Sequence, residues 1–195
     1  MHKLLSMSTM MPGASCLPDD SSAPKPVGLD SPAVEVMTDL RRVQAAKVDA
    51  SESIVQATQK MIARRVRLLL VVDSNDQIEG LITARDTMGE KPIKLLNQRG
   101  GKFEELTVGD LMVPRNLIDV LDINAVSHAE VGNVIATLKD IGRQHALVVE
   151  KDPHSGQQIV RGIFSATQIA RQLGVAIPIF EVAHTFAEIA AALKQ

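Results

Sequence analysis

Aromatic residues are scarce in this chain of 195 residues, which has four phenylalanines and neither tryptophan nor tyrosine. Proteins that bind single-stranded nucleic acid normally stack its bases on aromatic side chains. The 21 basic and 23 acidic residues nearly cancel and form no long run of one sign. The chain therefore also lacks the charge that would attract a nucleic acid or an anionic membrane, and we expect neither as a partner.

Cysteine and long apolar runs are scarce as well. Cys16 has no second cysteine to pair with, which excludes an intrachain disulfide and fits a reducing compartment. No apolar stretch approaches the roughly 18 residues that a membrane-spanning helix needs. The segments Met1-His-Lys-Leu-Leu and Gly13-Ala-Ser-Cys16 are weakly similar to a bacterial lipoprotein signal, but polar residues and Pro12 interrupt its apolar part. We therefore favour a cytoplasmic protein over an exported one.

The first part of the chain has the composition of a disordered segment. Residues 12–32 are rich in proline, serine, glycine and aspartate and show no hydrophobic period. Such a composition buries too little apolar surface to offset the entropy of ordering. We expect residues 1–32 to form a flexible tail.

The remainder of the chain contains an internal repeat. An apolar run, Leu68-Leu-Leu-Val-Val-Asp73, is followed after a short turn by Gly80-Leu-Ile-Thr-Ala-Arg-Asp86. The pattern returns as Ala146-Leu-Val-Val-Glu150 and Gly162-Ile-Phe-Ser-Ala-Thr-Gln168. Each apolar run is too short for a buried helix and predicts a buried strand, and the second segment predicts its hairpin partner.

A predicted helix precedes each hairpin. The apolar positions Ile54, Ala57, Met61 and Ile62 follow Ser51 at helical spacing, so we expect Ser51 to cap a helix that ends near residues 64–65. In the second copy, Ser127-His-Ala-Glu130 has the pattern of a capping box before a helix whose apolar face is Val131, Val134, Ile135 and Leu138. Short extended segments at residues 44–48 and 118–121 stand before these helices.

We therefore expect an α/β (α+β) fold made of two βαββ repeats related by a pseudo-twofold axis, at residues 33–101 and 102–176. A further capping box, Thr185-Phe-Ala-Glu188, predicts a C-terminal helix within residues 177–195. This helix is a candidate for subunit contact or for sealing the core.

The repeated motifs resemble those of the cystathionine-β-synthase (CBS) domain, which occurs as a tandem pair called a Bateman module. The matching segments are Val36-Met37-Thr38, residues 69–73 and residues 80–86, with a weaker second set that includes Leu111-Met112-Val113. The resemblance covers about residues 34–174. It implies two three-stranded sheets side by side, two clefts between them, and a flat homodimer.

The resemblance also implies a class of ligand. Bateman modules commonly bind AMP, ADP, ATP or S-adenosylmethionine, whereas some members bind metal ions, other nucleotides or no detected ligand. No cofactor is required, and the ligand acts as a signal. With no effector domain recognisable in the sequence, the effector protein is unknown.

The motif Gly-x-x-Thr-x-x-Asp has a chemical rationale as a nucleotide site. Gly80 permits close backbone approach, and the hydroxyl of Thr83 lies where a strand turns into a helix, next to free N–H groups that favour a phosphate. Asp86 lies one turn later on the same face, and its carboxylate can accept two hydrogen bonds from a ribose diol. The alternative is that Thr83 only caps the helix and Asp86 only complements its dipole.

The second copy of the motif is weaker. Ser165 keeps a hydroxyl, but Gln168 replaces the aspartate and cannot offer a charged, doubly accepting group. We expect two unequal sites, with the Thr83/Asp86 cleft dominant.

Other candidate ligand contacts follow from the resemblance. Family members that hold phosphates often place basic residues just before the buried strand, which makes Arg67 and His145 candidates and Arg143 a weaker one. Leu68 departs from this basic pattern. The alternatives are a solvated strand end for Arg67 and a partly buried, hydrogen-bonded imidazole for His145. The adenine would rest on the extended segment at residues 44–46, which contributes Ala45 and Ala46.

Two functions remain open on the sequence. The first is a non-catalytic sensor in which an adenosine-containing ligand shifts the repeats and changes a partner's activity. The second is a dimeric interaction or scaffold protein of the same fold with no nucleotide ligand. An enzyme is poorly supported, because the five histidines form no metal-ligand set and Arg85-Asp86 has no nearby base or second carboxylate. A metal ion bound by Asp152 and His154 is disfavoured against a solvated turn.

Overall fold

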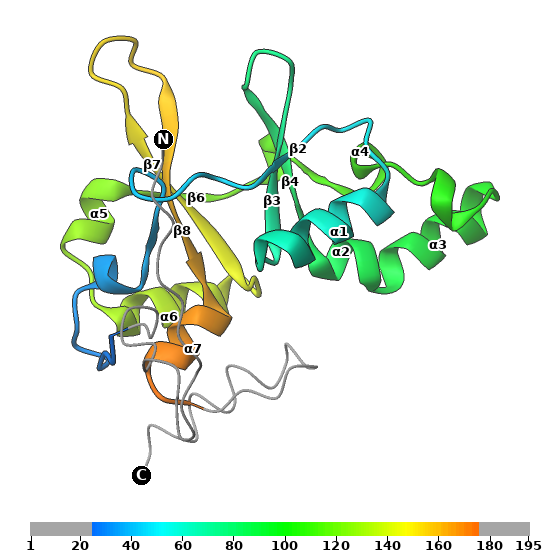
Figure 1. Cartoon of the computed structure of the whole chain (residues 1–195). Coiled ribbons are helices and arrows are strands. Elements are labelled where there is room, and N and C mark those ends of the chain that lie inside the picture. Colours follow the sequence, from blue (N-terminus) through cyan, green and yellow to red (C-terminus); the bar gives the residue numbers. More distant parts are fainter. Residues whose placement is uncertain (1–24, 176–195) are drawn as a thin grey trace, which may run out of the picture.

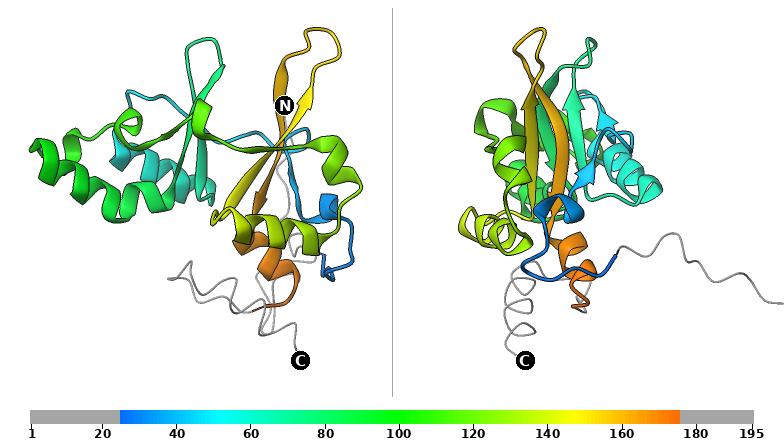
Figure 2. Two further views of the ribbon diagram at one scale, coloured as in Figure 1. Left: turned by 180° about the vertical axis from the view of Figure 1, so that it is seen from behind. Right: turned by 90° about the vertical axis from the view of Figure 1, so that its left-hand side faces the viewer.

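The computed structural model describes residues 25–175, which form two α/β halves packed side by side. The predicted C-terminal helix at residues 177–195 and most of the predicted tail lie outside the described residues. In Figures 1 and 2 the strands of the two halves occupy the middle of the molecule, and the two long hairpins project together at one end. The α/β fold expected from the repeat is confirmed.

Each half contains a four-stranded mixed sheet. The first has the order β2-β3-β4-β5, with β2 parallel to β3 and the other neighbours antiparallel. Its strands are β2 (Lys47–Val48), β3 (Leu68–Val72), β4 (Ile78–Thr83) and β5 (Val113–Pro114).

The second sheet repeats this plan in the order β1-β8-β7-β6, with β6 parallel to β7. Its strands are β1 (Thr38–Asp39), β6 (Val120–Asp122), β7 (His145–Lys151) and β8 (Gln158–Ser165). The predicted buried runs therefore form the central strands β3 and β7, whose side chains pack against helices on one face and against the other half on the opposite face.

Seven α-helices connect or cover the strands in the described region. They are α1 (Ile54–Arg64), α2 (Ala84–Met88), α3 (Glu90–Arg99), α4 (Val108–Leu111), α5 (Ile123–Ser127), α6 (Val131–Asp140) and α7 (Ala166–Gln172). Short 3-10 turns occupy Ala33–Val36, Phe103–Glu105 and Arg115–Leu117. None of the helices between residues 25 and 175 is long and apolar enough to cross a membrane.

The N-cap residues of α1 and α6 differ from the predicted ones. The cap of α1 is Ser53, which forms a capping box with Gln56, whereas the Ser51 hydroxyl donates to Asp49 at 2.6 Å. Ser127 lies at the end of α5, and its hydroxyl donates to the Asn124 carbonyl at 2.8 Å. The cap of α6 is Glu130. The two predictions were wrong because another polar residue, two or three positions further on, completes each cap.

The expected three-stranded sheets were wrong because the halves exchange short strands. β1, at the start of the described chain, pairs with β8 of the second half, where Thr38 lies opposite Ile163. β5, which follows the first half, returns to pair with β4, where Val113 lies opposite Leu81. Each sheet therefore contains one short strand from the other repeat of the sequence. β1 belongs to the first repeat and joins the second sheet, and β5 belongs to the second repeat and joins the first sheet.

The segment before β1 is packed from residue 25 onward, so part of the predicted tail is ordered. The amide of Val27 donates to the Gln172 carbonyl at 3.0 Å, and that of Gly132 donates to the Leu29 carbonyl at 2.9 Å. Ala33 and Val36 then enter the core of the second half. Burial of these two side chains and the new backbone hydrogen bonds offset the entropy of ordering the proline-rich segment.

Three apolar clusters hold the molecule together. One lies within each half, beneath the helices. The third lies between the halves and consists of the buried residues Leu68, Leu70, Leu81 and Leu147, with partly buried neighbours around them. Leu68, which departs from the family's basic pattern, thus serves as an apolar contact between the two sheets.

Candidate functional site

A cleft of about 590 Å³ lies between the halves, and its lining includes Thr83 and His145, which stand at the strand ends opposite the hairpin turns. The first half supplies residues from β4, α2, α3 and β5, and the second half supplies the segment that leads into β7. The lining residues are Leu81, Thr83, Arg85, Asp86, Gly89, Glu90, Lys91, Lys94, Val113, Gly142, Arg143, Gln144 and His145. A molecule bound here would contact both repeats at once.

Thr83 and Asp86 lie together in this cleft and are bonded to each other. The hydroxyl of Thr83 donates to Asp86 Oδ2 at 2.6 Å, and the amide of Thr83 donates to the same oxygen at 2.9 Å. This is the capping arrangement that the sequence left as an alternative. Because α2 has only five residues and the threonine hydroxyl already has an acceptor, the helix N-terminus alone offers little for a phosphate.

The other oxygen of Asp86 is bonded to a lysine that the sequence analysis did not single out. Lys91 Nζ donates to Asp86 Oδ1 at 2.8 Å and to the carbonyl of Leu111 at 2.7 Å. The side chain of Asp86 is only 14% exposed, whereas that of Lys91 is 47% exposed. The carboxylate is therefore held in place, whereas the lysine side chain lines the cleft and is partly open to solvent.

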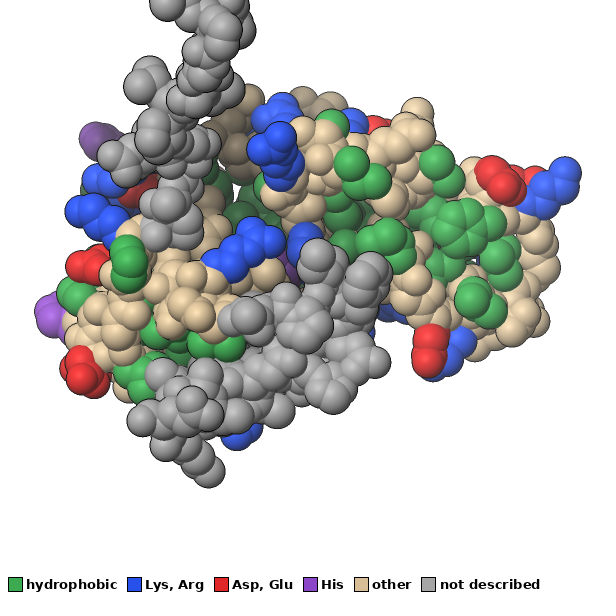
Figure 3. All heavy atoms as spheres, turned by 60° about the horizontal axis from the view of Figure 1, so that its bottom comes forward, with side chains coloured by type: hydrophobic (Ala, Val, Ile, Leu, Met, Phe, Trp, Pro, Cys, Tyr) green, Lys and Arg blue, Asp and Glu red, His purple; other side chains and the backbone are tan. Residues whose placement is uncertain are grey.

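The charge of the cleft favours an anion. Four cations, Arg85, Lys91, Lys94 and Arg143, line it against two carboxylates, Asp86 and Glu90. Lys94 lies 2.7 Å from Glu90 and lowers the pKa of that carboxyl. Figure 3 shows Lys and Arg side chains gathered where the two halves meet.

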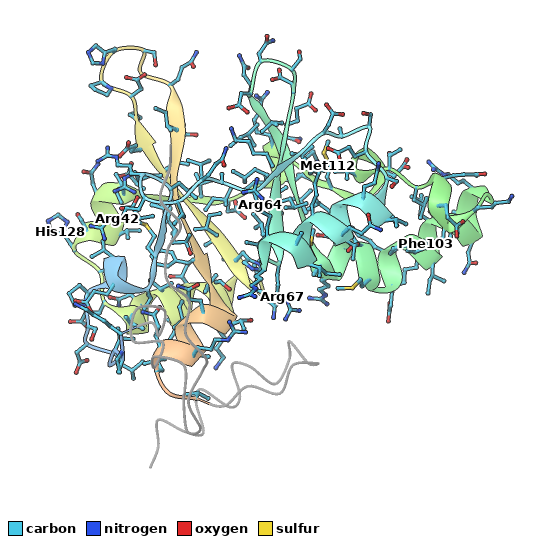
Figure 4. The ribbon with its side chains drawn as sticks, in the orientation of Figure 1. Arg42, Arg64, Arg67, Phe103, Met112 and His128 are labelled. Carbon is cyan, nitrogen blue, oxygen red and sulfur yellow. The ribbon has the colours of Figure 1, made fainter. Side chains whose placement is uncertain are left out.

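His145 stands at the start of β7 in the same cleft. Burial, and to a smaller extent the nearby Arg67 guanidinium, lower its pKa from 6.5 to about 4, although Asp86 partly opposes them. The imidazole is therefore neutral at neutral pH. Arg67 lies at the end of β3 that faces the second half (Figure 4). The structure thus brings Thr83, Asp86, Arg67 and His145 into one region, although Arg67 is outside the lining of the cleft.

Gly80 has a structural role in the exchange of strands. A Cβ atom at Gly80 would lie 2.5 Å from the carbonyl oxygen of Val113 and 3.0 Å from Met112 Sδ. The pseudo-symmetric Gly162 faces the side chain of Met37 in the same way. The close approach that the sequence predicted at Gly80 is therefore to β5 and Met112, and Gly80 does not line the cleft.

The remaining predicted contacts lie outside this cleft. Ser165 precedes α7 and pairs with His145 in the ladder of β7 and β8, and neither it nor Gln168 lines the cleft. Ala45 packs against the cluster between the halves, and Ala46 packs against the core of the first half.

The turn that contains Asp152 and His154 satisfies its own polar groups. The amide of His154 and the hydroxyl of Ser155 both donate to the Asp152 carboxylate, at 2.8 and 3.0 Å, and these bonds lower the pKa of Asp152. Within residues 25–175 no group of three or more His, Cys, Asp or Glu side chains is placed to hold a metal ion.

Sequence reasoning missed Glu90, Lys91 and Lys94. They belong to α3, which lies outside the repeated motif and so has no counterpart to draw attention to it. Their spacing could have indicated them, because Lys91 and Lys94 follow Asp86 by five and eight residues on a continuing helical segment. A break at Gly89 turns α3 so that both lysines reach the cleft.

Comparison with known proteins supports the same architecture. The family model of the CBS domain matches residues 32–90. Among curated proteins, no sequence matches this chain. An uncharacterized conserved protein from Pyrococcus horikoshii has a TM-score of 0.54 at 17% identity, over 78% of this chain and 98% of its own.

Two further solved structures are similar. A CBS-domain-containing protein from Agrobacterium tumefaciens has a TM-score of 0.53 at 16% identity, over 74% of this chain and 95% of its own. A conserved CBS domain protein of unknown function from Thermoplasma acidophilum has a TM-score of 0.50 at 21% identity, over 82% of this chain and 78% of its own. The CBS-domain model thus matches the first repeat, and the described part of the chain has the fold of a tandem CBS pair.

Proposed function

We propose that this protein is a non-catalytic regulatory module that binds an adenosine-containing nucleotide between its two CBS repeats and signals by conformational change. The observation that carries the proposal is the cleft between the halves, in which a fixed carboxylate, Asp86, is surrounded by four cations. Because both repeats line the cleft, a ligand there stabilises one relative arrangement of the repeats.

Each part of the cleft suits one part of a nucleotide. Asp86 accepts hydrogen bonds from the ribose hydroxyls, with Thr83 holding the carboxylate in position. The cations contributed by α2, α3 and the segment before β7 face the phosphates, and His145 and Arg67 lie within reach of the same anion. Gly80, Ala45 and Ala46 act through the packing of the strands that shape the cleft.

The charge of the cleft also discriminates between the two ligand classes of the family. AMP, ADP and ATP carry phosphates that complement an excess of cations, whereas S-adenosylmethionine carries a sulfonium cation that the same groups repel. We therefore favour a nucleotide phosphate. The pseudo-symmetric position at Ser165 and Gln168 has no carboxylate to accept the ribose diol, so we propose a weaker second site there.

Titration calorimetry and thermal shift of the full chain with AMP, ADP, ATP and S-adenosylmethionine test the proposal. We expect binding of a phosphate ligand near one per chain and weakening by roughly 10- to 100-fold in Asp86→Ala, which loses a charged acceptor. Thr83→Ala should weaken binding in the same direction and by a smaller factor.

The chain offers a matched control for helix capping. Thr107 donates to Asp110 from its amide and hydroxyl at 2.9 and 3.0 Å, and Asp110 pairs with Arg99, as Asp86 pairs with Lys91. Thr107→Ala and Asp110→Ala disturb the same kind of cap outside the cleft and should leave binding unchanged. Equal losses in both pairs would contradict a direct role for Asp86.

The alternative is a dimeric scaffold of the same fold with no nucleotide ligand. An exposed apolar surface on α1, α2 and α3 favours this function, because Ile62, Met88 and Ile93 are 72%, 66% and 60% exposed. No thermal shift with any of the four ligands, together with a stable dimer, would support the scaffold over the sensor.

A further inference from the structure

Lys91 connects the carboxylate of Asp86, which we propose binds the ribose, to the chain segment that joins the two repeats. Its ammonium group donates to Asp86 Oδ1 at 2.8 Å and to the carbonyl of Leu111 at 2.7 Å. Asp86 belongs to α2, and Leu111 is the last residue of α4. One side chain from α3 thus bridges two residues that are 25 positions apart in the sequence.

Asp86 already accepts three hydrogen bonds, so a ligand that binds its carboxylate would disturb this bridge. Its Oδ2 already accepts the amide and the hydroxyl of Thr83, so Oδ1 is the oxygen with capacity to spare. Lys91 occupies that oxygen. A ribose diol that donates two hydrogen bonds to the carboxylate therefore competes with the ammonium group of Lys91.

The other end of the bridge lies next to the exchanged strand. Leu111 is followed by Met112, which packs over Gly80, and by β5, which pairs with β4. The chain then continues through the 3-10 turn at Arg115–Leu117 to β6 of the second half. The position of the Leu111 carbonyl therefore bears directly on the segment through which the first repeat is joined to the second.

We propose that Lys91 is a positioning residue that reports occupancy of the cleft to residues 108–114. When a nucleotide takes the Asp86 carboxylate, the ammonium group moves toward the ligand phosphate and releases the Leu111 carbonyl. The release loosens the attachment of α4 and β5 to α3. This inference rests on the proposed nucleotide function and adds the route by which binding changes the relation of the two repeats.

Hydrogen exchange of the full chain, measured with and without AMP, tests this route. In the wild type, AMP should speed exchange at residues 108–114 while slowing it around residues 83–86. Lys91→Met should speed exchange at 108–114 without ligand by roughly two- to fivefold, the scale of one exposed ion pair. In that variant AMP should still bind by calorimetry and produce no further change at 108–114.

Two variants separate this role from a general effect of charge or folding. Lys94→Met removes a lysine from the same helix and the same cleft and should weaken AMP binding, but its partner is Glu90, so the response of 108–114 at saturating AMP should persist. Lys91→Arg keeps a cation that can donate to both acceptors and should restore the response. Adenosine, which has no phosphate, should bind Lys91→Met at least as tightly as the wild type, because the competitor for Asp86 is gone.

The outcomes distinguish this inference from the proposed function. If AMP binds the wild type and Lys91→Met still transmits the change to 108–114, or if Lys91→Arg fails to restore it, the route through Lys91 is wrong and the nucleotide site stands. If the wild type binds none of AMP, ADP, ATP and adenosine, the proposed function and this route both fall.

Discussion

Asp86 illustrates how one side chain can serve the fold and remain available to a ligand. Its hydrogen bonds with Thr83 cap α2, and the Thr107/Asp110 pair makes the same bonds at the start of α4 without a cleft around it. The motif Thr-x-x-Asp is therefore by itself a capping pattern. Its position at the junction of two repeats, among cations from both, is what supports a binding role for Asp86.

His145 gives a prediction at the same scale, for the dependence of stability on pH. Its folded-state pKa of about 4 lies below the value of about 6.5 for an unfolded histidine. Between these values the unfolded state binds a proton that the folded state does not, so the free energy of unfolding falls as the pH drops from 6.5 to 4. We expect His145→Gln to remove part of this slope, at most ~1.4 kcal/mol per pH unit.

Urea unfolding of the wild type and His145→Gln at several pH values from 7 to 4 measures the difference. Carboxyl groups with lowered pKa values, such as Asp39 and Asp110, titrate in both proteins and cancel in the comparison. His128→Gln is a suitable control, because this histidine is exposed. Parallel stability curves for wild type and His145→Gln would show that the imidazole is not held neutral in the folded protein.

At the scale of elements, the exchanged strands depend on two glycines. A methionine comes directly before each of β1 and β5 and packs against a glycine in the strand that the short strand joins. Met37 lies against Gly162 of β8, and Met112 lies against Gly80 of β4. The carbonyl of Val113 also lies against Gly80. The absence of a Cβ atom at these positions lets the exchanged segments approach the sheet closely enough to join it.

Substitution of the two glycines should have unequal effects. In Gly80→Ala the new methyl group would meet a backbone oxygen that cannot move without displacing β5, so we expect a loss of about 1–3 kcal/mol in the free energy of unfolding. In Gly162→Ala the three nearest atoms all belong to the flexible side chain of Met37, which can change rotamer at a smaller cost. Urea denaturation of both variants measures the difference.

A double variant tests the packing argument directly. Met37→Ala should recover part of the stability lost in Gly162→Ala, because it removes the atoms that the methyl group meets. The corresponding Met112→Ala should recover little in Gly80→Ala, where the Val113 oxygen remains. A larger loss in Gly162→Ala than in Gly80→Ala would show that the contact with Val113 does not limit the approach of β5.

At the scale of the whole molecule, apolar side chains remain uncovered on the helices of the first half. Ile62, Met88 and Ile93 project from α1, α2 and α3, and α2 packs against both neighbours. Figure 3 shows hydrophobic side chains gathered on this part of the surface. An apolar surface of this kind favours contact with another protein surface, and we predict that a second copy of the chain covers it.

The predicted homodimer can be tested by changing this surface. Ile62→Glu combined with Ile93→Glu should convert the dimer to a monomer, because charges placed in an apolar interface lose their hydration. Light scattering during size-exclusion chromatography measures the mass. Ile159→Glu, at a site 47% exposed on the hairpin of the second half, should leave the mass unchanged. A monomeric wild type would refute the prediction.

The sequence by itself determined the two central hairpins and the duplication. Leu68–Val72 and His145–Lys151 are strands because a short continuous apolar run can be buried only between a helical layer and a second packed surface. These are local patterns, and a repeated local pattern identifies a repeated unit without knowledge of its neighbours. Thr83 and Asp86 were found in the same way, since both belong to the repeated motif.

Tertiary structure alone decided which segments complete each sheet and which side chains surround the site. The motif segments Val36-Met37-Thr38 and Leu111-Met112-Val113 mark the positions of β1 and β5, but these strands are only two residues long, and they join sheets far from their own position in the sequence. Lys91 and Lys94 reach the cleft because the chain turns at Gly89, and His145 reaches it from the other half. Contacts between distant segments depend on packing geometry, and no spacing within the sequence encodes them.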